Sequence, residues 1–368
     1  MKEPKIRFKE FKGEWETSRL DSCVDFLDNL RKPIEEGNRI KGIYPYYGAS
    51  GIVDYVNDYI FVEELILLSE DGANITDRNY PVCFLASGKY WVNNHAHVLK
   101  AKDGFVNCFV SNAMERKDYS QYNTGMAMPK LNKEVCKNIP LTYPLIEEQQ
   151  SIASFFTTID AQISTSTSRL ASLKQIKAAS LQAMFPQEGE TVPKLRFKGF
   201  EGEWEETTIG NTASLRAGKS FNFQRTFEHM YPCYGGNGIR NYIDEYSHEG
   251  TYPIIGRQGA LCGNVTLAKG KFYATEHAVV ASPLKCNDSL FLYYCYTKAN
   301  LNRYAKGCAQ PGLAVSAINE VVIRIPDYQE QQSIASYFTN LDRQITLQAR
   351  RLEKLKQIKA ACLDKMFV

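Results

Sequence analysis

The chain has 368 residues, which is the size of two ordinary domains rather than of one hydrophobic core. Hydrophobic residues make up 44% of it and charged residues 23%, which excludes a disordered, collagen-like or disulfide-miniature chain. The net charge of +3 is too small to indicate a nucleic-acid partner by itself, and only residues 328–368 have a clear basic excess, with seven basic against four acidic groups.

The start of the chain, MKEPKIRFKE, lacks the apolar stretch of a signal peptide, and no run approaches the roughly 18 apolar residues of a membrane span. We therefore expect a cytoplasmic protein that does not cross a membrane. Ten cysteines are scattered without a CxxC pair, which favours free buried thiols over a zinc ribbon or a disulfide framework.

The chain repeats itself in three places. PKIRFKEFKGEWE at 4–16 returns as PKLRFKGFEGEWE at 193–205, with ten identities in 13 positions. YPYYGASGIVDYVNDY at 44–59 matches YPCYGGNGIRNYIDEY at 231–246. Residues 148–185 match residues 330–367 with 24 identities in 38 positions. The period is far longer than that of a solenoid repeat, so a whole module with an appended segment has been duplicated.

The appended segments have apolar residues at spacings of three and four, which predicts two long helices of about 38 residues, or roughly 57 Å. The predicted seam consists of Ile152, Phe155, Ile159, Ile163, Leu170 and Leu173 in the first helix and Ile334, Tyr337, Leu341, Ile345, Leu352 and Leu355 in the second, and the spacing continues to Ile176 and Ile358. Pro144 and Pro326 lie just before the two starts, Asp327 and Glu330 resemble a capping pair, and Pro186 ends the first helix.

One narrow apolar stripe on so long a helix needs a partner, and we expect the two helices to form an antiparallel coiled coil with each other. The alternative is that each helix packs only on its own module. The middle of the seam is polar, at Ser164–Ser168 and at Gln348. These residues either fix the register or mark a bend or a solvated stretch.

The modules are rich in aromatic and β-branched residues with glycine between them, as in GIYPYYGASGIVDY and TYPIIGRQGALCGNVTLAKGKFYATEHAVVA. This pattern is typical of short strands and turns, so we expect an α+β fold with two similar modules of mixed helix and strand. The expected boundaries are 1–145 for the first module, 146–186 for the first helix, 187–327 for the second module and 328–368 for the second helix.

Catalytic motifs are not visible in the chain. ASLRAGKS at 213–220 resembles a phosphate loop but has Ala213 where the first glycine belongs. His95 and His97 would face the same side of a strand, and His277 with Glu276 occupies the matching place in the second module. A metal site would need a third ligand that the spacing does not supply, so hydrogen-bonding histidines and no metal are expected. GxSxG, HExxH and GxGxxG are absent.

The two copies differ most in one turn. Glu70, Asp71 and Gly72 in SEDGANI align with Arg257, Gln258 and Gly259 in GRQGALC, so the same turn has opposite polar chemistry in the two modules. Arginine and glutamine pair bidentately with guanine and adenine, and acidic groups accept from cytosine, so these residues are candidate DNA contacts. The alternative is that they are ordinary solvated turn residues. Further candidates for DNA contact are Lys89, His95 and His277.

Over essentially its whole length the chain resembles the specificity subunit of Type I restriction-modification enzymes. The resemblance rests on EQQSIAS, LDRQI and LKQIKAACLDKMF in the helices, on the tail GCAQPGLAVSAINEVVIRIPDYQEQQ, and on the duplicated openings. In that family two target recognition domains each read one half of a split, asymmetric DNA target, and two conserved helices hold them apart. Gln310 fits the family's tail in GCAQPG and joins the candidate contacts, whereas the first copy reads GMAMPK with Met128.

The resemblance implies a subunit that is not an enzyme and holds no cofactor itself. Its implied partners are double-stranded DNA, two modification subunits that methylate adenine with S-adenosylmethionine, and restriction subunits that use ATP and Mg. Two rival functions remain at this stage. One is a single-chain methyltransferase or nuclease, for which no catalytic set is found, and the other is an unpartnered paralogue that only exchanges recognition specificity.

Overall fold

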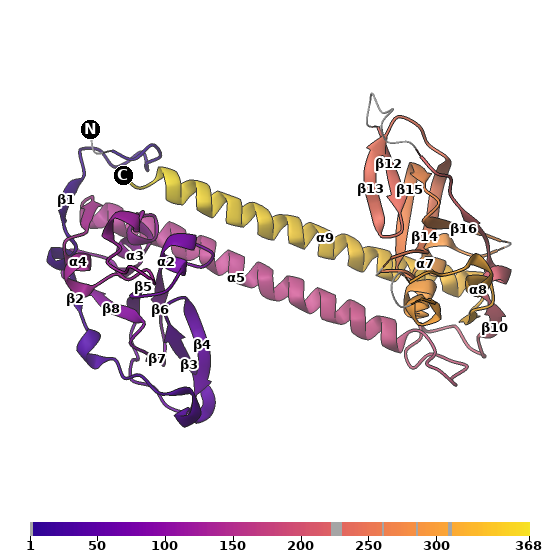
Figure 1. The fold of residues 1–368 in the computed structure, drawn as a ribbon, viewed down its shortest axis with the longest axis horizontal. Coiled ribbons are helices and arrows are strands. Elements are labelled where there is room, and N and C mark those ends of the chain that lie inside the picture. The colour runs from indigo at the N-terminus through magenta and orange to yellow at the C-terminus, as the bar shows by residue number, and fades with distance from the viewer. Residues whose placement is uncertain (1–2, 222–229, 260, 285, 308–310) are drawn as a thin grey trace. The chain divides into compact units, whose positions relative to one another are not determined.

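The computed structural model describes residues 3–221, 230–259, 261–284, 286–307 and 311–368. The chain divides into two compact units, one made of Met1–Thr167 with Arg350–Val368 and the other of Ser168–Ala349. Each unit therefore combines one module with a part of both long helices (Figure 1). None of the helices in the described ranges is long and apolar enough to cross a membrane.

The first unit contains three small sheets. Their strand orders are β1-β9, β2-β8-β5-β6 and β4-β3-β7. The strands are β1 Glu16–Arg19, β2 Val24–Phe26, β3 Lys41–Gly48, β4 Gly51–Val56, β5 Leu65–Ser69, β6 Cys83–Ala86, β7 Trp91–Val92, β8 Ala96–Ala101 and β9 Pro140–Tyr143. The helices are α1 Leu20–Cys23, α2 Asn74–Asp77, α3 Asn107–Glu115 and α4 Lys133–Lys137, with short 3-10 turns at Asp28–Leu30, Glu36–Asn38 and Ser120–Tyr122.

The second unit repeats this plan with a larger sheet. Its strand orders are β10-β17 and β11-β16-β14-β15-β12-β13. The strands are β10 Glu205–Thr208, β11 Ala213–Ala217, β12 Tyr231–Gly235, β13 Gly238–Ile243, β14 His248–Gly256, β15 Val265–Ala274, β16 Ala278–Pro283 and β17 Val322–Ile325. The helices are α6 Ile209–Thr212, α7 Ser289–Lys298 and α8 Val315–Asn319, with a 3-10 turn at Leu301–Tyr304.

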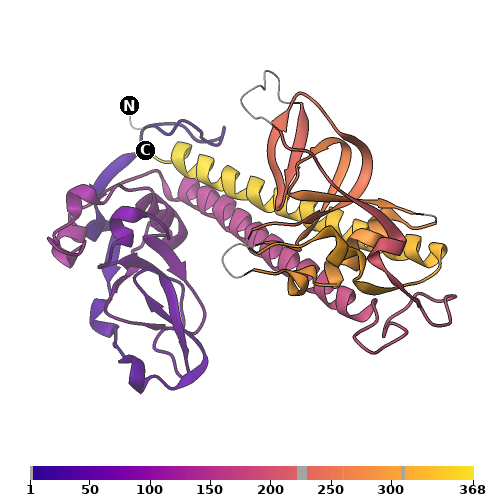
Figure 2. The same ribbon diagram turned by 45° about the vertical axis from the view of Figure 1, so that its right-hand side comes forward.

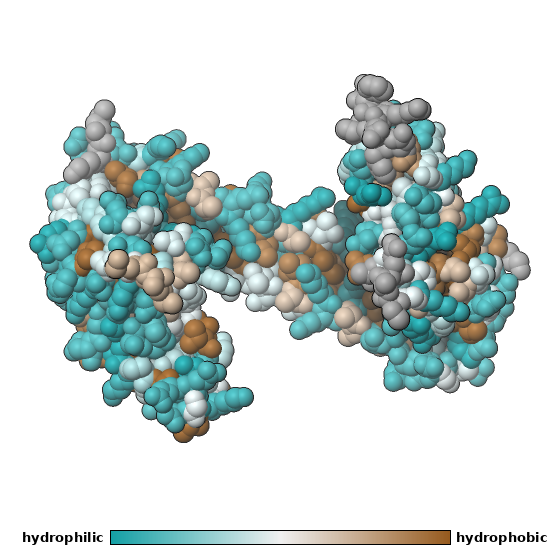
Figure 3. Space-filling model, viewed as in Figure 1, coloured by the Kyte–Doolittle hydropathy of each residue, from teal (hydrophilic) through white to brown (hydrophobic). Residues whose placement is uncertain are grey.

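The expected α+β fold with two similar modules is confirmed, and one helix fills the same place in each. The helix α3 contacts β5 and β6, and α7 contacts β14 and β15. The strand β5 is buried at every position, as its sequence LILLS requires for a strand covered on both faces. On the face of the molecule drawn in Figure 3 most of the surface is hydrophilic, with apolar side chains in small groups.

The two predicted long helices are present as α5, Ile146–Ala183, and α9, Tyr328–Lys365, each of 38 residues (Figures 1 and 2). The predicted cap forms in part. The carboxylate of Asp327 accepts a hydrogen bond of 2.9 Å from the backbone N–H of Glu330. The carboxylate of Glu330 does not return to the cap and instead binds Arg196.

Within the first unit the helices run antiparallel. The ring of Phe156 packs against Phe367 with centroids 5.8 Å apart, and one turn further along α5 Asp160 pairs with Lys359 at 2.6 Å. Because a step forward along α5 corresponds to a step backward along α9, the two segments have opposite directions.

Within the second unit the same relation holds. Lys177 pairs with Asp342 at 2.5 Å, and the hydroxyl of Ser180 lies 2.9 Å from that of Tyr337. Further on, the ring of Phe185 lies 6.1 Å from that of Phe338.

The predicted seam is buried only in part. Ile152, Ile159, Ile334 and Leu341 are buried, and the other eight seam residues are half-buried. The extension of the stripe to Ile176 and Ile358 is wrong, because these side chains are 47% and 39% exposed. The polar middle includes two buried side chains, Ser166 and Gln348.

Much of each helix's apolar surface is used by a module core. Ile152 and Phe156 of α5 join Met366 and Phe367 from the end of α9 in the core of the first unit. Ile334 and Phe338 of α9 join Met184 and Phe185 from the end of α5 in the core of the second unit. Packing on a module and packing on the other helix therefore occur together.

Candidate functional site

The turn of the first module, Glu70–Gly72, is held by backbone hydrogen bonds on both sides. The N–H of Glu70 donates to the carbonyl of His95 at 2.9 Å, and the N–H of Gly72 donates to that of Pro129 at 3.0 Å. The φ of Gly72 is 109°, a left-handed conformation that glycine adopts without strain. The sequence therefore places a rigid turn between β5 and α2.

The turn of the second module, Arg257–Gly259, repeats these bonds. The N–H of Arg257 donates to the carbonyl of His277 at 3.0 Å, and the N–H of Gly259 donates to that of Pro311 at 3.0 Å. Gly259 has a φ of 88°. The predicted equivalence of the two turns, and of His277 with His95, is thus visible in the backbone.

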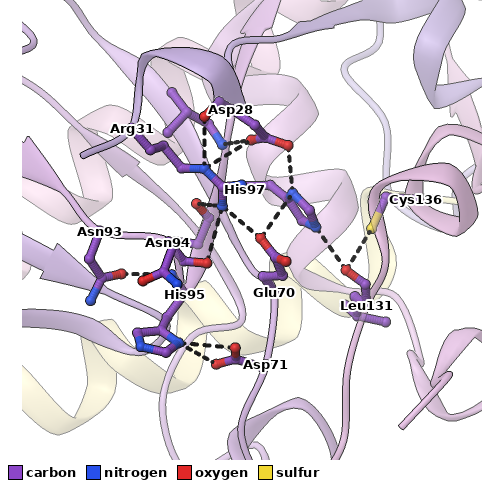
Figure 4. A network of polar contacts seen from close by, with 12 residues as sticks. Asp28, Arg31, Glu70, Asp71, Asn93, Asn94, His95, His97, Leu131 and Cys136 are labelled. Carbon is purple, nitrogen blue, oxygen red and sulfur yellow. Dashed lines mark hydrogen bonds and ion pairs between the residues drawn. The ribbon is translucent and has the colours of Figure 1, made fainter. Parts of the chain in front are cut away.

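Glu70 is occupied by cations of its own module (Figure 4). A terminal nitrogen of Arg31 donates to its carboxylate at 2.6 Å, and the ammonium of Lys130 lies 3.7 Å away. The side chain of Glu70 is only 17% exposed. Because its oxygens already face these partners, Glu70 acts in the scaffold of the turn, and the structure does not favour the prediction that it contacts a base.

His97 is a buried charged group rather than a surface contact. Its Nδ1 lies 2.9 Å from the carboxylate of Asp28 and its Nε2 lies 2.8 Å from the carbonyl oxygen of Leu131. Both partners are acceptors, so both ring nitrogens carry protons. Burial opposes that charge, but the hydrogen bond with Asp28 and the interaction with Cys136 together outweigh burial and raise the pKa of His97 to about 10.

His95 and His97 do not face the same side, which corrects the prediction. His95 precedes β8 in a turn, so the alternation of a strand does not apply to it. Its side chain is 50% exposed and its Nδ1 lies 2.9 Å and 3.0 Å from the two carboxylate oxygens of Asp71. Figure 4 shows the two rings directed at different carboxylates. The Asp71–His95 pair is the part of the first turn that reaches solvent.

The side chains of the second turn lack the charged partners that the first turn has. Gln258 is exposed and Arg257 is half-buried, and Arg257 forms no ion pair in the described part of the chain. A shallow cleft of about 580 Å³ lies beside them, lined by Gly235, Gly236, Asn237, Gly238, Ile239, Arg240, Gln258, Gly259, Leu261 and His277. The turn after β12 approaches the end of β14 so closely that glycine is needed there, because a Cβ on Gly256 would lie 1.8 Å from the carbonyl oxygen of Gly236.

One predicted contact, Lys89, lies apart from these turns. The ammonium of Lys89 lies 4.7 Å from the centre of the Tyr59 ring, a cation–π contact on an exposed part of the first module. Gln310 lies outside the described residues. In those residues no group of three or more His, Cys, Asp or Glu side chains is arranged to hold a metal ion.

The cysteines fit the expectation of free thiols. Those at 23, 83, 108, 136, 233, 262 and 295 are buried and free. Cys286 is exposed and Cys362 is half-buried, and both are also free. Cys308 lies outside the described residues. Burial raises the pKa of Cys23 and of Cys233 to about 11, which keeps these thiols protonated and unreactive near neutral pH.

The family model for the Type I restriction modification DNA specificity domain matches the chain twice, at residues 12–175 and 201–357. Each match contains one of the two turns. The chain belongs to this specificity family. The buried network around Glu70 and the open turn at Arg257 therefore lie in two specificity domains of one chain.

Individual relatives agree with this membership. The chain is 42% identical over 173 residues to the Type I restriction enzyme EcoprrI specificity subunit of Escherichia coli, a match that covers 46% of this chain and 42% of that relative. It thus spans less than half of that protein. It is 21% identical over 407 residues to the Type I restriction enzyme MjaVIII specificity subunit of Methanocaldococcus jannaschii, covering 97% of this chain and 94% of the relative.

A solved structure shares the fold. The S subunit of a Type I restriction-modification system from M. genitalium superposes with a TM-score of 0.79 at 15% identity, covering 100% of this chain and 99% of that one. At this level of identity the likeness concerns the fold alone.

Proposed function

We propose that this specificity chain reads a bipartite, asymmetric target in double-stranded DNA, with one module for each half-site. The observation that supports the proposal most is the shared backbone of the two turns with different side-chain chemistry: Asp71 corresponds to Gln258, and Glu70, which its own cations retain, corresponds to Arg257. Two modules that recognise two different sequences need a shared backbone with different side chains at the contact positions.

The chain is a non-catalytic subunit in this proposal. Two modification subunits, using S-adenosylmethionine, methylate adenine in the target, and restriction subunits supply the chemistry that uses ATP and Mg. The helices α5 and α9 are the docking surface for these partners and set the separation of the half-sites. The complex acts in the cytoplasm, where the DNA lies.

Adenine-methylation mapping of cells tests the proposal. The chain is expressed with its modification subunits and, as a control, the modification subunits are expressed alone. We expect methylation at one split sequence only when the chain is present. Methylation by the isolated chain would favour the single-chain methyltransferase instead, and failure to co-purify with modification subunits would favour the unpartnered paralogue.

Binding of the isolated chain to DNA gives a second test. The modules are close to charge balance, so they have few groups with which to neutralise phosphates alone. We expect weak binding by the isolated chain and tight binding by the complex. A salt slope for the isolated chain that implies roughly six or more phosphate contacts would contradict this division of labour.

A further inference from the structure

Three buried polar atoms without a hydrogen-bond partner belong to the second turn and to the connection between β15 and β16 that is hydrogen-bonded to it. They are Nε of Arg257, Oγ1 of Thr275 and Nδ1 of His277. The backbone N–H of Arg257 donates to the carbonyl of His277, and Thr275 lies two positions before His277 in the chain. Because nearly all buried polar groups in folded proteins are bonded, such a group indicates a site that is incomplete in the isolated chain.

The corresponding atoms of the first module all have partners inside the protein. Asn93 matches Thr275, because its N–H donates to the carbonyl of Tyr47 at 3.0 Å, and its side-chain oxygen accepts from the N–H of His95 at 2.8 Å. His95 pairs with Asp71, and Glu70 pairs with Arg31. The first turn is therefore complete without a ligand, and the second is not.

The residue opposite each turn also differs in charge between the two modules. Lys130 bridges to Asp71 through the backbone and places its ammonium 3.7 Å from Glu70. Gly312 makes the equivalent bridge to Gln258 and has no side chain. Where the first module has Glu70 opposite Lys130, the second module therefore has Arg257 opposite Gly312. The guanidinium of Arg257 has no counter-ion among the described residues.

We propose that Arg257 reads a guanine in the half-site of the second module, and that the absence of a side chain at Gly312 keeps Arg257 available. This inference rests on the proposed function and assigns a base to one of its two sites. A guanidinium donates two hydrogen bonds to O6 and N7 of guanine in the major groove, a pattern that no other base presents. Glu70, which holds the same place in the first module, is retained by its own cations.

The test uses the complex of the full chain with modification subunits and maps adenine methylation. Arg257→Ala is expected to reduce discrimination at one guanine of one half-site roughly 5- to 150-fold, with the other half-site unchanged. Arg303→Ala is the matched control, because Arg303 is an exposed arginine of the same module whose guanidinium lies over Tyr304. This control should leave the target unchanged.

A second pair of variants separates reading from structure. Gly312→Lys is sterically tolerated, because a Cβ there meets only the carbonyl oxygen of Lys306 at 4.0 Å. It should weaken discrimination at the same guanine by repelling Arg257. The double variant R257E/G312K recreates the pair between Glu70 and Lys130 of the first module, so its melting temperature should be close to that of the wild type while the guanine is no longer selected.

The outcomes are distinct. If R257A or R257E/G312K still selects the wild-type target, Arg257 is not a reader and the inference is wrong. If a loss of selection in Arg257→Glu is restored by the added Gly312→Lys, the role of Arg257 is structural and the inference is also wrong. If the wild-type complex selects no sequence, the proposed function itself fails.

Discussion

The guanidinium of Arg7 donates two parallel hydrogen bonds to the carboxylate of Glu148, each 2.8 Å long. Glu148 is only 2% exposed, so this is a buried ion pair that joins the opening of the chain to the first turn of α5. The second module repeats it between Arg196 and Glu330, with both bonds 2.7 Å long. In each module this contact joins the repeated opening to the repeated EQQSIAS motif.

Removal of Arg7 should destabilise the first unit alone. Arg7→Ala leaves the buried carboxylate of Glu148 without a counter-ion, which costs about 3–5 kcal/mol. We expect faster hydrogen exchange in α3 and unchanged exchange in α7. Arg196→Ala is the matched control and should produce the reverse pattern. Equal effects on both helices from either variant would show that the units do not unfold separately.

The helices were predictable to within a few residues because their signals are local. Apolar spacing, a proline before each start and a capping aspartate all lie within one segment of the sequence. The packing of the Met-Phe pairs at the two helix ends was not predictable. Met184 and Phe185 read as the fraying end of a helix before Pro186, and nothing nearby shows that Trp204 and Phe291 cover them.

Truncation of Phe367 should lower the stability of the first unit. Its ring packs against Trp15, Phe109 and Phe156 and is 4% exposed, so Phe367→Ala costs about 3–5 kcal/mol through lost burial and the remaining cavity. Hydrogen exchange of α3 measures the effect. Val368→Ala, at an exposed neighbouring position, is the control and should change little. Unaltered exchange in F367A would mean that α9 does not complete this core.

The chemistry of the first turn was also hidden from the sequence. Glu70 and Asp71 look alike as neighbouring acids, yet Arg31 binds one and His95 the other. Arg31 is 39 positions away from Glu70, with β3, β4 and β5 between them, and no periodicity of the sequence connects residues across such a segment. The sequence did contain one signal of this contact. Lys130 aligns with Gly312, and Glu70 aligns with Arg257, so the positive charge is missing in the same module in which the acid is replaced by a base.

The stability of the first unit should depend on pH through His97. Its pKa is 6.5 in an unfolded chain and about 10 in the folded protein, so its contribution is complete below pH 6.5 and is lost as the pH rises through about 10. At acidic pH the stability of the first unit should depend on Asp28. Burial opposes its charge, but the hydrogen bond from His97 lowers its pKa, so its contribution is lost as the pH falls below the ordinary value of 3.8.

Urea unfolding at several pH values between 6.5 and 10 measures this dependence. In a Trp204→Phe background the remaining tryptophans, Trp15 and Trp91, both lie in the first unit and report on it alone. The free energy of unfolding should decrease across this range, and His97→Gln should reduce the slope. Parallel slopes with and without the substitution would show that His97 is not charged in the folded protein.

Lengthening both helices tests whether they set the separation of the half-sites. Four residues inserted after Leu170 and four after Leu352 add about 6 Å to each helix and turn it by about 400°, which keeps the apolar faces nearly in phase. At roughly 3.4 Å per base pair along one strand, the methylated target should gain one or two base pairs between its halves. Two-residue insertions at the same places rotate the faces by about 200° and should prevent assembly. If the complex with four added residues is active and its target spacing is unchanged, the helices only bind partner subunits. Helices that fix the distance between the two recognition modules cannot change length without changing the spacing of the target.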